Sequence, residues 1–227
     1  MPYRWLLFDA DDTLFDYQIA EEKSLQHAFE LIHIPFKKEI AETYRNINHD
    51  YWAQFEAGKI QLTDLRYRRF SDLFAHYALA ADPVSFSEIY LDGLGLVADL
   101  IPGVLDIITR LSSTFQMAII TNGITQVQYS RLSLSPIQTF FKHVFISEEI
   151  GISKPTAGFF DFVFQTIGNP PKEDVLVIGD SLSSDMTGGI NYGLDTCWYN
   201  PRRLKNPNHL PVTYEIQSIT QVLDIVE

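Results

Sequence analysis

The chain has 227 residues, of which 46% are hydrophobic, and this suits one large domain or a core with a smaller insertion. Its formal net charge of −12, from 17 basic and 29 acidic residues, argues against nucleic-acid polymers and anionic membranes as partners. A small phosphorylated substrate is not excluded, because the geometry of a local site can outweigh net charge.

The first predicted element is a buried strand at residues 5–8, and three aspartates follow it directly. Asp9, Asp11 and Asp12 are so close that their carboxylates repel one another unless a positive group lies among them. A solvated turn could carry such a cluster, but unpaired charge at the end of a buried strand is costly. The cluster therefore raises the question of a cation and an anionic substrate.

Residues 16–97 contain no convincing strand, and their apolar residues recur at helical spacing. Gly58 ends one such apolar stripe in a position typical of the residue after a helix; the stripe comprises Ile40, Tyr44, Ile47, Tyr51 and Phe55. Thr63 is a candidate N-cap of the next helix, and Asp82 with Pro83 marks a further helix start. This pattern predicts an all-helical cap domain inserted after the first strand.

We expect the chain to return from the cap through a segment that contains Gly93 and Gly95. Strands and helices alternate in the remainder of the chain. Short apolar runs predict buried strands at 117–120, 144–146, 175–178 and 196–199, and helices are expected at 103–111 and 158–167. The alternation predicts an α/β fold with a doubly wound parallel sheet. We expect residues 1–15 and 98–227 to form this core and residues 16–97 to form the cap.

Four predicted strand ends carry polar residues, at the edge where open α/β sheets bind ligands. Besides the first aspartates, they are Thr121 with Asn122, Lys154 in the loop after the third strand, and Asp180 followed by Asp185. Each alone is ordinary, as a turn, a solvated lysine or an acid near a helix start. All four in this order predict one shared site.

Carboxylates clustered without histidine or cysteine suit a hard, oxygen-seeking cation such as Mg²⁺. A carboxylate beside that cation can act as a covalent nucleophile toward phosphorus. Phosphoryl transfer chiefly requires alignment and charge neutralisation, which the cation, the Lys154 ammonium and the Thr121 hydroxyl could supply. A second carboxylate two residues after the first can protonate the leaving oxygen and later accept a proton from water.

The motifs DADDT, ITNG, SKP and GDSLSSD resemble the four signatures of the haloacid dehalogenase (HAD) superfamily of phosphotransferases, over nearly the whole chain. The helical insertion lies where that superfamily has its C1-type cap, on a Rossmann-like core. The resemblance implies that Asp9 is the nucleophile, forming an aspartyl-phosphate, and that Asp11 is the general acid and base. An acid at this place favours a phosphatase over a dehalogenase, because halide leaves without a proton.

The same resemblance implies the ligands of the phosphate and of the cation. Phosphate would be bound by Asp9, Thr121, Lys154 and the backbone at Asn122 and Asp12, the last standing where many members have glycine. Mg²⁺ would be held by Asp9, Asp180 and the Asp11 carbonyl, with Asp185 in the outer shell.

Several stretches are similar to the bacterial pyrimidine 5′-nucleotidase branch of the superfamily, among them NHDYWAQFEAGKI in the cap. This resemblance implies a small phosphorylated partner, a nucleoside 5′-monophosphate with a pyrimidine base. Phosphoglycolate or a sugar phosphate is the alternative substrate. A phosphomutase and a binding protein without turnover are further alternatives, and the intact set of motif residues argues against the second.

Aromatic residues in the cap could stack on a base, and the pocket candidates are Tyr17, Trp52, Arg66 and Phe70. Tyr51 and Phe55 fall on the apolar stripe, which favours a place in the core. Arg66 lies one helical turn from Arg69, and a solvated basic face competes with substrate contact for this pair.

The single cysteine, Cys197, excludes an intrachain disulfide and fits a reducing compartment. The sequence shows no signal-peptide pattern and no apolar run of bilayer length, so we expect a cytoplasmic protein. The sequence leaves the oligomeric state open.

Overall fold

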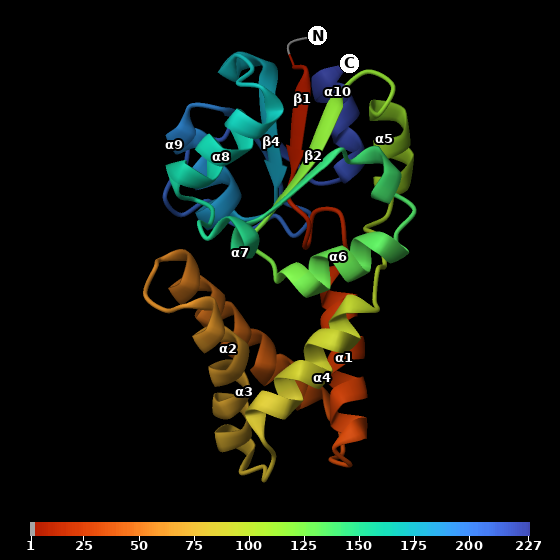
Figure 1. The fold of residues 1–227 in the computed structure, drawn as a ribbon, viewed down its shortest axis with the longest axis vertical. Coiled ribbons are helices and arrows are strands. Elements are labelled where there is room, and N and C mark those ends of the chain that lie inside the picture. Colours follow the sequence, from red (N-terminus) through yellow and green to blue (C-terminus); the bar gives the residue numbers. More distant parts are fainter. Residues whose placement is uncertain (1–2) are drawn as a thin grey trace.

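The computed structural model describes residues 3–227, in which a sheet-based core stands above a group of four helices in the view of Figure 1. The sheet has six parallel strands in the order β3-β2-β1-β4-β5-β6. The strands are β1 (Trp5–Phe8), β2 (Gln116–Thr121), β3 (His143–Ile146), β4 (Val175–Gly179), β5 (Asp195–Tyr199) and β6 (Tyr214–Ile216). The five predicted strands are confirmed, and β6 is an additional edge strand.

Helices cover both faces of the sheet, as expected for a doubly wound fold (Figure 1). Helices α5 (Val104–Leu111) and α10 (Val222–Val226) lie on one face, and α8 (Ala157–Ile167) and α9 (Thr187–Tyr192) lie on the other. Strand side chains alternate accordingly: Leu6 and Phe8 of β1 pack in the core with α5, and Leu7 packs in the core with α8. Two further helices, α6 (Thr125–Leu134) and α7 (Ser147–Ile150), follow β2 and β3.

The cap consists of α1 (Tyr17–Leu31), α2 (Lys38–Glu56), α3 (Leu62–Tyr77) and α4 (Pro83–Gly95). Asp82 caps α4 as predicted, because its side chain accepts a 2.9 Å hydrogen bond from the Ser85 backbone. The prediction of Thr63 as the cap of α3 is wrong. Gln61 takes that place and forms a capping box with Asp64.

The cap joins the core through two segments that lie side by side, since Phe15 forms a bridge with Leu100. Gly93 and Gly95 were expected in the returning segment, but both lie in the last turn of α4. A Cβ atom at Gly95 would come 3.1 Å from Ser130, so this glycine lets α4 approach α6 closely. The apolar interior of the cap accordingly extends onto α6 through Ile124 and Val127.

In the part of the chain that the structure describes, four short helical segments complete the fold, at Gln138–Phe140, Lys172–Asp174, Leu182–Met186 and Ile219–Gln221. Within residues 3–227, no helix combines the length and the apolar character that crossing a membrane would require.

Candidate active site

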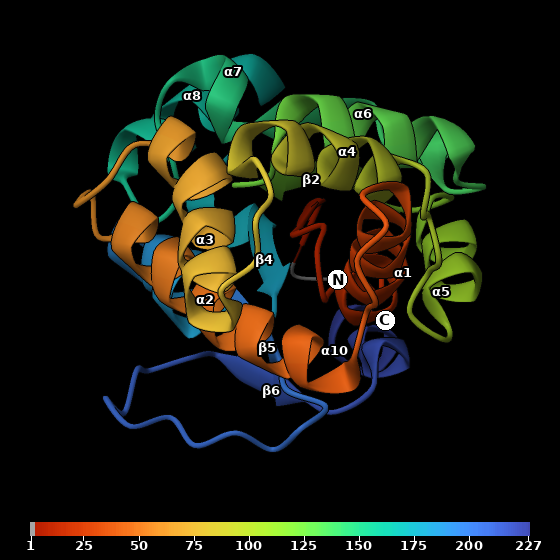
Figure 2. The same cartoon turned by 90° about the horizontal axis from the view of Figure 1, so that it is seen from below.

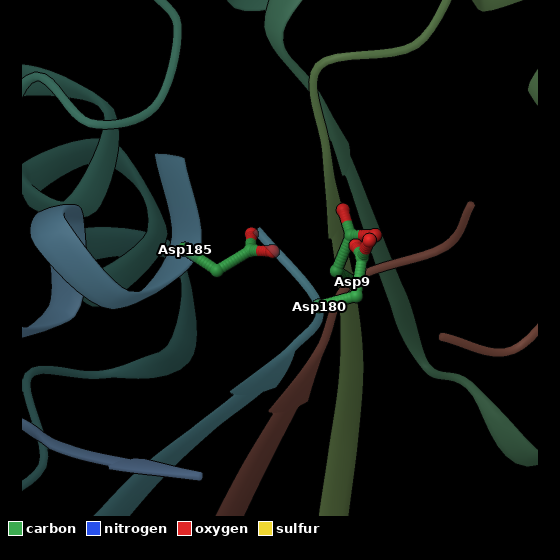
Figure 3. A group of neighbouring side chains, drawn as sticks. All are labelled: Asp9, Asp180 and Asp185. Carbon is green, nitrogen blue, oxygen red and sulfur yellow. The ribbon is translucent and has the colours of Figure 1, made fainter. Parts of the chain in front are cut away.

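Three carboxylates meet at the end of the central strands (Figure 3). Asp9 follows β1 and Asp180 follows β4, its neighbour in the sheet, while Asp185 comes from the turn at Leu182–Met186. An oxygen from each side chain lies within 4.8 Å of the others. A Cβ atom at Gly179 would come 2.3 Å from Asp185, so only glycine leaves room for this approach. An all-oxygen donor set of this kind fits Mg²⁺.

Lys154 is the cation that the structure places among these carboxylates, with only 1% of its surface exposed. Its Nζ donates to Asp9 at 2.7 Å, to Asp185 at 2.6 Å and to the Ile120 carbonyl at 2.8 Å. The Asn122 side chain fixes the lysine backbone, because its amide donates to the Lys154 carbonyl at 2.9 Å and accepts from the Lys154 N–H at 3.0 Å. The ammonium is therefore held in one place.

The electrostatics of the cluster favour an additional positive charge. Burial, and then the repulsion of neighbouring carboxylates, raises the pKa of Asp9 and of Asp180 well above the ordinary value, although Lys154 opposes this. Burial alone would lower the pKa of Lys154, but the carboxylates of Asp185 and Asp9 outweigh it, and the pKa is raised. A divalent cation at this point would compensate the excess negative charge.

Thr121 and Asp12 flank the carboxylates from two loops. The Thr121 hydroxyl oxygen accepts a 2.9 Å hydrogen bond from the Gly123 N–H, which leaves its own hydrogen free to donate to a ligand. Asp12 has a left-handed backbone with φ of 56° and lines the cavity described below. Burial, and then the nearby Asp11, raises the pKa of Asp12 to about 6.

Asp11, the expected general acid, makes its contacts with α6 and lies outside the three-carboxylate group. Its side chain forms an ion pair with Arg131 and accepts a 2.6 Å hydrogen bond from Gln128. The fully buried guanidinium of Arg131 also contacts both cap connections, through the Val97 carbonyl at 3.1 Å and the Phe15 ring at 4.5 Å. This partnership was not predicted from the sequence.

A cavity of about 440 Å³ lies between the carboxylates and the cap. Tyr17 and Trp52, two of the expected pocket residues, line it. Its polar wall was not predicted from the sequence; the wall includes Glu21, Arg45, Asn48, His49, Glu56 and Arg202. All but Arg202, which follows β5, lie on α1 and α2. Polar residues are normal on the faces of surface helices and in loops, so nothing in the sequence marked these as pocket residues.

Arg66 and Phe70 do not line this cavity, contrary to expectation. Phe70 is fully buried in the interior of the cap, stacked on Tyr44 at 5.3 Å between ring centroids. Arg66 instead forms a 2.6 Å ion pair with Glu148 of α7. The alternative prediction, that Arg66 and Arg69 form a solvated basic face, is wrong for Arg69, because only 1% of its surface is exposed.

Comparison with known proteins agrees with this arrangement. The family model described as haloacid dehalogenase-like hydrolase matches residues 6–199. Bacillus subtilis HAD-hydrolase YfnB is 39% identical over 99% of this chain and 95% of its own. Its magnesium-bound crystal structure superposes with a TM-score of 0.96, covers 100% of both chains and is described as revealing interdomain movement.

Two further relatives are named pyrimidine 5′-nucleotidases. PynA of Streptococcus pneumoniae is 35% identical, over 100% of this chain and 96% of its own. YjjG of Escherichia coli is 30% identical, over 98% of this chain and 97% of its own. From the extent of the family match and these identities, the chain belongs to the haloacid dehalogenase-like hydrolases and is an enzyme of their phosphatase type.

Proposed function

We propose that this chain is a Mg²⁺-dependent phosphomonoesterase that hydrolyses nucleoside 5′-monophosphates, with a preference for pyrimidine bases. The observation that carries the proposal is the contact of one buried ammonium, Lys154, with Asp9 and Asp185 beside Asp180, at the floor of a cavity. Such a site combines a nucleophile, a counter-charge and a set of oxygen ligands for a cation.

The reaction has two steps. An Asp9 oxygen attacks phosphorus and forms the aspartyl-phosphate, while the bond from phosphorus to the ester oxygen breaks and Asp11 protonates that oxygen. Water then attacks the same phosphorus, gives its proton to Asp11, and releases phosphate and the Asp9 carboxylate. To serve in both steps, Asp11 has to turn away from Arg131 and Gln128, its partners in this structure.

The remaining residues hold the phosphoryl group and the cation. Lys154, the Thr121 hydroxyl and the backbone N–H at Asn122 would bind phosphoryl oxygens, since the Asn122 side chain is already engaged. Mg²⁺ would be held by Asp9, Asp180 and the Asp11 carbonyl, with Asp185 behind them. When bound, the ion supplies positive charge to the equatorial oxygens.

The substrate assignment rests on the cavity and on the relatives. The names of PynA and YjjG support a pyrimidine nucleotide. The volume of about 440 Å³ falls in the ordinary range for small-molecule sites, and Trp52 offers an aromatic surface to a base.

The test is phosphate release with Mg²⁺ from a panel of UMP, dTMP, CMP, AMP, phosphoglycolate and ribose 5-phosphate. We expect the highest kcat/KM with a pyrimidine monophosphate. Faster hydrolysis of phosphoglycolate or ribose 5-phosphate would retain the chemistry and refute the nucleotide assignment. If the native chain released phosphate from none of these compounds, the proposed phosphatase reaction itself would be refuted.

A further inference from the structure

Two buried polar side chains of the cap line the cavity and have no role in the proposed reaction. Glu21 of α1 and Asn48 of α2 line the cavity, although only 3% and 5% of their surfaces are exposed. Burial of a carboxylate and an amide between helices is costly unless each has a hydrogen-bonding task. Their contacts define what each can offer to a ligand.

The side chain of Asn48 is held in one orientation. Its Oδ1 accepts a 2.8 Å hydrogen bond from Arg69, and because arginine only donates, this fixes the oxygen on the arginine side. The Arg69 guanidinium is itself set against the rings of Tyr44, Phe70 and Tyr90, at 5.8, 5.0 and 5.2 Å from the centroids. Asn48 therefore presents its NH₂ group on the opposite side.

That NH₂ group and the neighbouring carboxylate both retain capacity for a ligand. Asn48 Nδ2 makes only long contacts among residues 3–227, at 3.3 Å to the Tyr17 hydroxyl and 3.5 Å to Glu21 Oε2. Glu21 Oε1 accepts a 2.9 Å hydrogen bond from Arg45, which anchors the carboxylate and leaves Oε2 with the long contact alone. The pair offers one donor beside one acceptor.

The position of Asn48 along α2 matches the length of a nucleotide. Glu56, near the end of α2, accepts a 2.6 Å hydrogen bond from Ser183 in the turn that carries Asp185. Asn48 lies eight residues earlier on the same cavity-lining face, which is about 12 Å along the helix axis. Trp52 lies between them on that face. From the Glu56 end of this face, a three-carbon phosphate is too short to span about 12 Å to Asn48, whereas a nucleotide is long enough.

We propose that Asn48 and Glu21 are specificity-determining residues that read the distal edge of the base, with Arg69 as the residue that positions Asn48. The Asn48 NH₂ donates to a ring carbonyl oxygen and Glu21 accepts from the adjacent ring N–H. Uracil and thymine present this pair as O4 and N3–H. Cytosine presents the reverse, an amino group beside an unprotonated nitrogen. This inference rests on the proposed nucleotidase function.

The experiment compares kcat/KM for UMP and CMP, which differ only at this edge. We expect the native chain to prefer UMP, and Glu21→Gln to lower the UMP/CMP ratio at least about tenfold, the effect of one hydrogen bond to a charged group. The double variant Asn48→Asp with Glu21→Gln keeps the net charge and reverses donor and acceptor. We expect it to prefer CMP. Glu22→Gln is the matched control, because this exposed neighbour also contacts Arg45 but does not line the cavity.

Turnover of ribose 5-phosphate, which has no base, checks that each variant is folded and chemically competent. We expect all of them to hydrolyse it. If UMP and CMP are both hydrolysed and the ratio is the same in the native chain, in Glu21→Gln and in the double variant, the inference is overturned and the nucleotidase function stands. If ribose 5-phosphate is hydrolysed and neither nucleotide is, the nucleotidase function fails and the inference fails with it.

Discussion

At the scale of single residues, Asp180→Ala tests the proposed place of the cation. The change removes one proposed oxygen ligand while Lys154 keeps its contacts with Asp9 and Asp185, so we expect an intact fold and a Mg²⁺ requirement shifted to at least about tenfold higher concentration. The measurement is phosphate release as a function of Mg²⁺ concentration. An unchanged titration curve would remove Asp180 from the ligand set.

The residues at the strand ends could be predicted from the sequence, but the long-range partners could not. Asp9, Lys154 and Asp180 could be placed together because the carboxyl ends of parallel strands share one edge of a sheet, and the structure brings them together. Arg69 was misread, because a basic helical run such as RYRR is normally solvated. The partnership of Asp11 with Arg131 joins residues 120 positions apart, and no local pattern reports it.

Glu21→Gln also has a stability consequence that is independent of catalysis. Burial raises the pKa of Glu21 from 4.5 to about 7, although Arg45 and Arg69 oppose this. The folded state thus holds the proton more tightly than the unfolded state, and the native chain loses stability as pH rises from about 4.5 to about 7.

The glutamine variant does not titrate, so its free energy of unfolding should gain about 1 to 3 kcal/mol relative to the native chain across that pH window. Urea unfolding at pH 4.5 and pH 8 measures this difference. The same difference at both pH values would contradict the raised pKa.

At the scale of elements, long periodic segments were predictable and short or capped ones were less so. The apolar stripe in 40–55 correctly indicated α2. The edge strand β6 has only three residues, YEI, and carries no apolar run that could predict it. The start of α3 was predicted wrongly. Threonine is a common N-cap residue, which favoured Thr63, but Gln61 caps this helix.

Glu148 joins two elements, and its replacement should cost more than the loss of an ion pair. One carboxylate oxygen accepts from Arg66 at 2.6 Å, and the other accepts from the Thr125 N–H at the start of α6 at 2.8 Å. We expect Glu148→Ala to lower the free energy of unfolding by about 1 to 2 kcal/mol, through loss of this cap.

Arg66→Gln is the comparison, since it removes the ion pair and keeps the cap of α6. Both partners are partly exposed, so its loss should stay below about 1 kcal/mol. Chemical denaturation of the two variants measures both effects, and equal losses would show that Glu148 does not cap α6.

At the scale of the whole molecule, cap and core are joined by two adjacent connections and by the contact of α4 with α6, which lie side by side in Figure 2. The buried Arg131 contacts both connections and also Asp11, the expected general acid. A rotation of the cap would therefore act on the orientation of the Asp11 side chain through these contacts. The sequence showed the inserted helices but not this contact, because it depends on how α6 packs. We expect the hinges of the cap to lie in the two connections, at Phe15 and Asp16 and at residues 96–99, because Gly93 and Gly95 lie within α4.

We expect the cap to move relative to the core when substrate binds, because a site that transfers phosphoryl groups has to exclude water and then release product. Spin labels at Ser71→Cys on α3 and Gln165→Cys on α8 would report this, and the native Cys197 is buried. In an Asp9→Asn background, Mg²⁺ with UMP should shift the distance distribution between the labels. An identical distribution with and without UMP at saturation would contradict cap movement.

The most direct test of the account is phosphate release from UMP by the native chain and by Asp9→Asn. Asparagine keeps the size of the side chain and removes the nucleophilic carboxylate, and Lys154 retains its contact with Asp185, so the variant should fold. We predict turnover by the native chain with Mg²⁺, loss of turnover with EDTA, and loss of at least about a thousandfold in kcat for the folded variant. Substantial phosphate release by Asp9→Asn would contradict the central claim that Asp9 carries the phosphoryl group.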